Sequence, residues 1–107
     1  MCIRDSLDGS RSPFDQLAEI VDAVGDKIDV ICEGGFQRGT HMLKALSIGA
    51  KACSGGRLYL YALAAAGQAG VERALGQYKA ELERDMKLMG CKKISDLNRG
   101  NLRFRKL

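Results

Sequence analysis

Apolar residues recur along the chain at two different spacings, one typical of helices and one of strands. Residues 13–24 place apolar side chains three or four positions apart, which predicts an amphipathic helix. Ser12 and Pro13 supply a cap and a first helical residue, and Gly25 is a natural stop. Residues 27–32 are rich in β-branched side chains, and their near-continuous apolar character is typical of a parallel strand covered on both faces.

The same order repeats once before the chain closes with helices. The pattern predicts a helix, a second strand and two further helices, in this order: residues 42–49, 51–54, 58–66 and 70–89. One more turn at residues 94–97 and an irregular tail complete the prediction. Strands that alternate with helices imply right-handed crossovers and a parallel sheet, so the predicted fold class is α/β.

The last long helix carries an apolar stripe that we expect to lie in the core. Its members are Val71, Leu75, Tyr78, Leu82, Met86 and Met89.

Each predicted strand opens into a glycine-rich loop that leads into a helix, at residues 33–39 and 55–57. Glycine lets main-chain N–H groups approach an anion closely, and the following helix offers the positive end of its dipole. Arg57 adds a cationic fork that suits a phosphate. We therefore predict a phosphate site shared by the two loops. The spacing alone leaves open that the glycines only form tight turns.

The position of these loops indicates a particular architecture. Phosphate sites of (β/α)8 barrels commonly form from the loops after strands 7 and 8, and these two strands are the last in the chain. A complete barrel needs about 250 residues, more than the 107 present. The prediction is therefore the C-terminal part of a TIM barrel, comprising strands 7 and 8, their helices and the closing helices.

The net charge of +4 comes from the end of the chain, where residues 91–107 carry six basic side chains and one acidic side chain. A nucleic-acid surface would alternate such charges with aromatic residues, and here only Phe104 is interleaved. We predict no nucleic-acid partner and a basic tail, residues 98–107, that packs over an acidic surface. A small basic nucleic-acid-binding module is the alternative.

The cysteines and the hydropathy indicate a cytoplasmic protein. None of the four cysteines is part of a CxxC pair or lies at a ligand spacing from a histidine, so we expect reduced thiols and no metal site. No apolar run approaches the roughly 18 residues of a transmembrane helix. Charged residues stand at the N-terminus where a signal peptide would have an apolar stretch, so we expect no export signal there.

The motifs also resemble a known family. EGGFQRGTHMLKALSIGA, residues 33–50, resembles the DGGxRxGxDxxKALxLGA stretch of the FMN-dependent alpha-hydroxy-acid dehydrogenases. The following GR pair, the closing helix at residues 67–91 and LDG at residues 7–9 extend the resemblance to about residues 7–102. The resemblance implies an FMN cofactor whose phosphate and ribityl chain are held at seven positions: Glu33, Gly34, Gly35, Phe36, Gln37, Gly56 and Arg57.

Three positions in and just after the first loop depart from the family pattern, and Leu58 stands where the family commonly has proline. Glu33 replaces an aspartate and keeps the carboxylate on a longer arm. Gln37 replaces an arginine, and this loss of a charged hydrogen bond costs roughly 1.5–3 kcal/mol unless Arg38 reaches into the site. His41 replaces another aspartate, and we expect it to be a surface or capping residue.

The resemblance implies a parent enzyme, a homo-oligomer, that oxidises a small L-2-hydroxy acid to the 2-oxo acid. The family's catalytic histidine and substrate-binding arginine belong to an HGGRQ motif before LDG, where this chain reads MCIRDS. We therefore expect a foreign leader at residues 1–6, a barrel portion at residues 7–97, no catalytic residue and no activity of the chain alone. The alternative is part of another phosphate-binding barrel, of the inosine-monophosphate dehydrogenase or glutamate synthase type.

Overall fold

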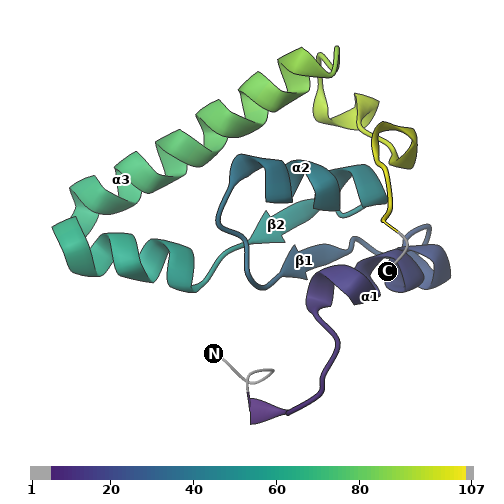
Figure 1. Ribbon diagram of the computed structural model, residues 1–107, viewed down its shortest axis with the longest axis horizontal. Helices are drawn as coiled ribbons and strands as arrows, with labels where there is room; N and C mark the ends of the chain where they lie inside the picture. Colours follow the sequence, from purple (N-terminus) through teal and green to yellow (C-terminus); the bar gives the residue numbers. More distant parts are fainter. Residues whose placement is uncertain (1–5, 106–107) are drawn as a thin grey trace.

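The computed structural model describes residues 6–105, so all but the last residue of the predicted leader lies outside the described residues. Figure 1 shows a small parallel sheet with helices beside it and one long bent helix around the outside. The helices and strands, in chain order, are α1 (Pro13–Val24), β1 (Ile31–Glu33), α2 (Gly39–Ile48), β2 (Ala52–Ser54), α3 (Arg57–Leu88) and the 3-10 helices η2 (Ile94–Asp96) and η3 (Arg99–Asn101).

The sheet has two parallel strands, β1 and β2, joined through α2 as the alternating pattern predicts. In β1 only Cys32 is buried, whereas Ile31 is 62% exposed. The prediction that both faces of this strand are covered is therefore wrong for the part of the chain that the structure describes. Only the helix-facing side has a layer packed on it.

β1 is also shorter than its predicted span, residues 27–32. The backbone N–H groups of Lys27 and Ile28 both donate to the carbonyl of Val24, at 2.9 and 3.0 Å. This turn takes up donors that a strand would have used, and regular pairing begins only at Ile31.

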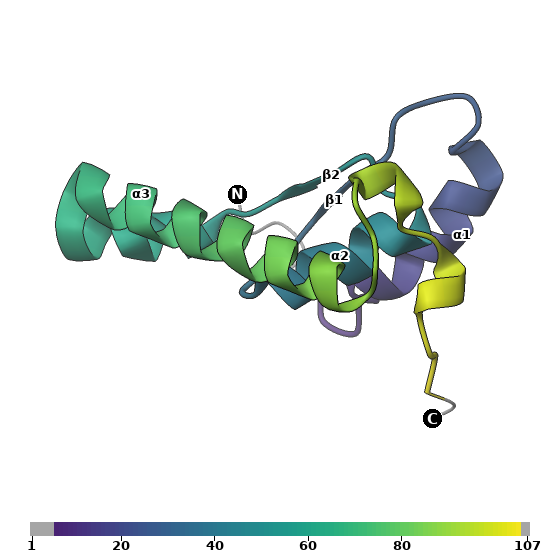
Figure 2. The ribbon, with the colours of Figure 1, turned by 90° about the horizontal axis from the view of Figure 1, so that it is seen from above.

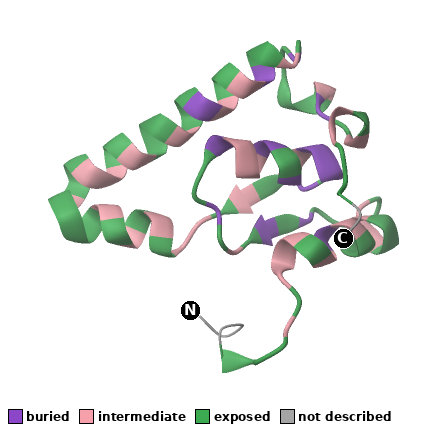
Figure 3. Cartoon of the chain, viewed as in Figure 1, coloured by how far each residue is buried: buried purple, intermediate pink, exposed green. Residues whose placement is uncertain are grey.

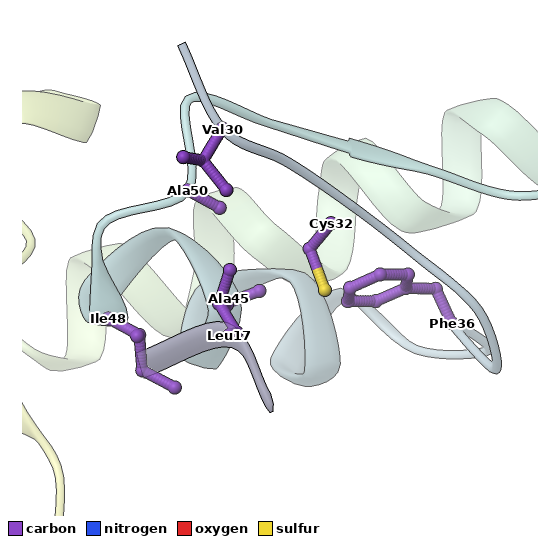
Figure 4. Packing of buried hydrophobic residues seen from close by; sticks show 7 residues of the cluster. All are labelled: Leu17, Val30, Cys32, Phe36, Ala45, Ile48 and Ala50. Carbon is purple, nitrogen blue, oxygen red and sulfur yellow. The ribbon is translucent and has the colours of Figure 1, made fainter. Parts of the chain in front are cut away.

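The main core lies between the sheet, α1 and α2, and Figure 4 shows its packing. It consists of Leu17, Val30, Cys32, Phe36, Ala45, Ile48 and Ala50. The predicted bounds of α1 are confirmed, and Ser12 caps the helix by accepting the N–H of Asp15 at 3.1 Å. This cap fixes where the helix starts, and its apolar face then covers the core.

The bent helix α3 contains the break that Gly67 predicts. Ala66 and Gly67 have non-helical backbone angles, and Gly67 has φ +57°. The predicted helices 58–66 and 70–89 are thus two arms of α3 joined at a kink. Figure 2 shows the kinked end of α3 projecting away from the sheet. The second arm packs on α2 through a smaller core of Leu43, Met86, Cys91 and Leu97.

Only part of the predicted apolar stripe on α3 is in the core. Met86 is buried, but Leu75 is 55% exposed. Figure 3 shows buried positions gathered on α2 and on the end of α3 nearest to it, while the first arm carries none. Nothing among residues 6–105 packs on the exposed part of the stripe.

The tail is more ordered than the irregular segment predicted from the sequence. Asn98 caps η3, and the Arg99 side chain donates from Nε to the carbonyl of Ile48 at 3.1 Å. The same side chain binds Asp22 of α1 at 2.7 Å. Arg99 therefore joins the tail to the ends of α1 and α2.

Candidate functional site: two glycine loops at one edge of the sheet

The two glycine loops leave the sheet at the same edge. β1 and β2 are parallel, and their last residues, Glu33 and Ser54, are register partners. The segments that follow them, 34–38 and 55–56, therefore start side by side, and each leads into a helix, as Figure 1 shows. This arrangement is the one that a phosphate shared between the loops requires.

The first loop has a backbone that only glycine adopts readily. Gly34 and Gly35 have φ of +118° and +74°. A Cβ on Gly34 would lie 2.9 Å from the ring of Pro13, so the loop passes close to the start of α1. A Cβ on Gly35 would meet nothing within 4 Å. The backbone is therefore packed on one side and open on the other.

The second loop ends at a helix terminus that lacks the usual capping groups. Gly56 is the N-cap of α3, no side chain caps it, and the first turn holds no acidic residue. The exposed Arg57 occupies the first helical position instead. A cation at this end opposes the helix dipole, and helices normally place an acid or a capping hydroxyl there. An anion bound here would be favoured both by the helix dipole and by the guanidinium of Arg57.

The first backbone N–H of α2 is bonded to an acidic side chain of the protein itself. The buried carboxylate of Glu81, on α3, accepts the backbone N–H of Gly39 at 2.8 Å. Nε of Arg38 donates to both oxygens of the same carboxylate, at 3.0 and 3.1 Å. The hydrogen bond from Arg38 and, to a smaller extent, that from Gly39 lower the pKa of Glu81 to about 2. The Glu81 carboxylate therefore already lies at the start of α2, whereas the first turn of α3 holds no acidic residue. An external anion can bind at the N-terminus of α3.

The carboxylate of Glu81 also explains where α2 begins. The sequence predicts this helix from residue 42, but it starts at Gly39. Since Glu81 accepts the Gly39 N–H, the first turn forms without a side-chain cap of its own. Glu81 is the residue that the sequence reasoning missed, because its partner lies 42 positions away and no local signal marks it.

The predicted site residues fall into two groups. Glu33, Gly35, Gln37 and Arg57 are exposed, while Gly34 and Gly56 are partly buried, all at the loop edge of the sheet. Phe36 differs, because its side chain is 5% exposed and belongs to the core in Figure 4. Only the backbone of Phe36 remains for a ligand.

The neighbours of Gln37 refine two expectations about the loop. His41 accepts the backbone N–H of Gln37 at Nδ1, at 3.3 Å, which fits the expected capping role. Arg38 makes its Nε bonds to Glu81 on α3. The positive charge that the loop lacks at position 37 is therefore not replaced by the Nε group of Arg38.

The cysteines and other potential ligands add no second centre at this edge. Cys32, Cys53 and Cys91 are free thiols, and burial raises the pKa of Cys53 to about 11, which disfavours a reactive thiolate. Among the described side chains, no group of three or more His, Cys, Asp and Glu residues is placed to hold a metal ion. No described helix has the length and apolarity that a membrane crossing needs.

The shifted pKa of Glu81 predicts how stability depends on pH. The folded-state pKa of about 2 lies below the ordinary value of 4.5. The contribution of Glu81 is therefore fully present above about pH 4.5, and it is lost as the pH falls toward and through 2. We expect the difference in free energy of unfolding between the wild-type chain and Glu81→Gln to be constant from pH 7 to 5 and to shrink below pH 4.5, measured by urea unfolding. An increase of this difference toward low pH would contradict the assignment.

Comparison with known proteins identifies the family. The model of the FMN-dependent dehydrogenase family matches residues 5–104. An L-lactate oxidase of a Nostoc species is 45% identical over 92 residues, which are 86% of this chain and 25% of that protein. An L-lactate dehydrogenase (cytochrome) of Wickerhamomyces anomalus is 42% identical over 96 residues, which are 85% of this chain and 17% of that protein.

A comparison with solved structures also finds a dehydrogenase similar in fold to this chain. A soluble mutant of the membrane-associated (S)-mandelate dehydrogenase of Pseudomonas putida matches with a TM-score of 0.87 and 38% identity, over 92% of this chain and 28% of that chain. The chain spans a quarter or less of the length of the two curated relatives above. The family match does not favour the inosine-monophosphate dehydrogenase, glutamate synthase or nucleic-acid-binding alternatives. The chain belongs to the FMN-dependent dehydrogenase family, whose cofactor is FMN.

Proposed function

We propose that this chain supplies the FMN phosphate site of an oxidoreductase that converts a small L-2-hydroxy acid to the 2-oxo acid. The observation that carries the proposal is the pairing of two glycine loops at one sheet edge with an uncapped α3 N-terminus that bears Arg57. The names of the relatives support the substrate class, since they include lactate and other 2-hydroxyacid oxidases. When bound, FMN supplies the redox chemistry, and the protein binds and orients it.

The residues of this chain would divide the binding task. The open backbone of Gly35 and the first N–H groups of α3 would donate to phosphate oxygens, and Arg57 would balance their charge. Glu33 is exposed at the end of β1, and its carboxylate would accept hydrogen bonds from hydroxyl groups of the ribityl chain. We assign no catalytic base among the described residues, and we expect no turnover by the chain alone.

The remaining features of the parent enzyme are predictions. We place β1 and β2 as strands 7 and 8 of a (β/α)8 barrel, with further strands pairing at the open edges of the present sheet. We also predict a homo-oligomeric parent. A cytoplasmic location stays a prediction, because relatives include a peroxisomal oxidase of Arabidopsis thaliana and a membrane-associated dehydrogenase.

The proposal predicts that the chain distinguishes FMN from riboflavin, which lacks the phosphate. We expect FMN to bind at least about tenfold more tightly, since the charged contacts lie at the phosphate. Equilibrium titrations followed by flavin fluorescence anisotropy measure both affinities. Inorganic phosphate should compete with FMN and leave riboflavin binding unchanged. Equal affinities for the two flavins would overturn the proposal.

A further inference from the structure

Glu81 connects two parts of the proposed site that are far apart in the sequence. α3 begins at the second glycine loop with Arg57, and its second arm passes the end of the first loop, where Glu81 binds Arg38 and Gly39. Figure 1 shows this path, with α3 leaving β2, turning at the kink and returning alongside α2. One helix therefore contacts both loops, at its start and at Glu81.

The contact at Gly39 leaves no room for adjustment. A Cβ on Gly39 would lie 2.5 Å from the Cβ of Glu81 and 2.6 Å from the backbone nitrogen of Leu82. The backbones of α2 and α3 thus touch at the residue that follows the first loop. The Glu81 carboxylate is buried and bonded to both Arg38 and Gly39 at this point, so its loss would release the end of the loop.

We infer that Glu81 is a positioning residue for the FMN phosphate, a role that rests on the proposed function. Its carboxylate fixes the end of the first loop relative to the helix that begins at the second loop. It acts through the backbone of residues 33–39 and contacts no phosphate itself. The competing arrangement makes Arg38 a phosphate ligand that Glu81 withholds from the site.

Removing the charge of Glu81 distinguishes the positioning role from the competing arrangement, because the two predict opposite changes in FMN affinity. If Glu81 positions the loop, Glu81→Gln weakens FMN binding about tenfold and leaves riboflavin binding unchanged. If Glu81 only withholds Arg38, the same variant frees a cation and FMN binds more tightly. Glu83→Gln is the matched control, because it removes the same charge from an exposed position of the same helix and should change neither affinity.

The experiment uses the full 107-residue chain, with flavin fluorescence anisotropy for both ligands and far-UV circular dichroism for folding. Arg38→Gln is a second variant that keeps the Gly39–Glu81 bond, and we expect it to weaken FMN binding about threefold. It decides the question if Glu81→Gln does not fold. An equal loss of FMN and riboflavin affinity, or no loss, overturns the positioning role. If the wild-type chain itself binds both flavins equally, the proposed function fails first.

Discussion

Replacing Gly39 with alanine is expected to lower the free energy of unfolding by about 3 kcal/mol, an effect at the upper end of overpacking substitutions. The added Cβ would lie 2.5 Å from Cβ of Glu81 and 2.6 Å from the backbone nitrogen of Leu82. Neither atom is at the free end of a flexible side chain, so α3 must move away from α2. This movement would also lengthen the 2.8 Å bond between the Gly39 N–H and Glu81. Urea unfolding followed by circular dichroism measures the change.

Gly76 provides the matched control for this substitution. It lies in the second arm of α3, where a Cβ would meet nothing within 4 Å. Gly76→Ala should therefore raise the free energy of unfolding by about 0.5–1 kcal/mol, since alanine loses less backbone entropy in a helix. If Gly39→Ala costs less than about 1 kcal/mol, the smallest cost usual for overpacking, the close contact between α2 and α3 is wrong.

The sequence correctly predicted those boundaries of helices that are set by residues close together along the chain. Ser12 and Pro13 set the start of α1 as predicted, because the cap and its donor are three residues apart. Gly67 marks the kink of α3 for the same reason, since the chain turns through its own φ of +57° and the non-helical angles of the adjacent Ala66. The parallel pairing of β1 and β2 followed from the alternation of strands and helices. The sequence therefore also predicted that the two loops share an edge.

The features that the sequence did not predict depend on partners distant along the chain. α2 starts early because of Glu81, which no pattern near Gly39 could indicate. Phe36 has the appearance of a loop residue but packs in the core, since the loop folds back onto α1 and α2. Ile31 and Leu75 have the periodicity of buried residues, yet they are 62% and 55% exposed. Periodicity marks the face that favours burial, and whether it is buried depends on a neighbouring layer.

The second large effect is expected at Arg57. Arg57→Gln should weaken FMN binding about thirtyfold, because a charged, fork-shaped contact to the phosphate is lost from the N-terminus of α3. Riboflavin binding should remain unchanged, which separates loss of the phosphate contact from loss of the fold. Arg84→Gln is the control, since Arg84 is an exposed arginine of the same helix, paired with Asp85. A variant that binds FMN as tightly as the wild-type chain would remove Arg57 from the site.

The first loop offers a test of whether both loops act on one phosphate. Gln37 is exposed and occupies the position where the family pattern has arginine, so Gln37→Arg adds a cation from the side of β1. If the loops converge, this substitution should strengthen FMN binding about fivefold in the wild-type chain and by a larger factor in the Arg57→Gln background, where the new cation replaces the lost one. Groups that bind the same anion are coupled, whereas groups at separate positions contribute independently. Anisotropy titrations of the two single variants and the double variant measure this coupling. An equal gain from Gln37→Arg in the wild-type chain and in the Arg57→Gln background would show that the two loops contribute independently and do not share the anion.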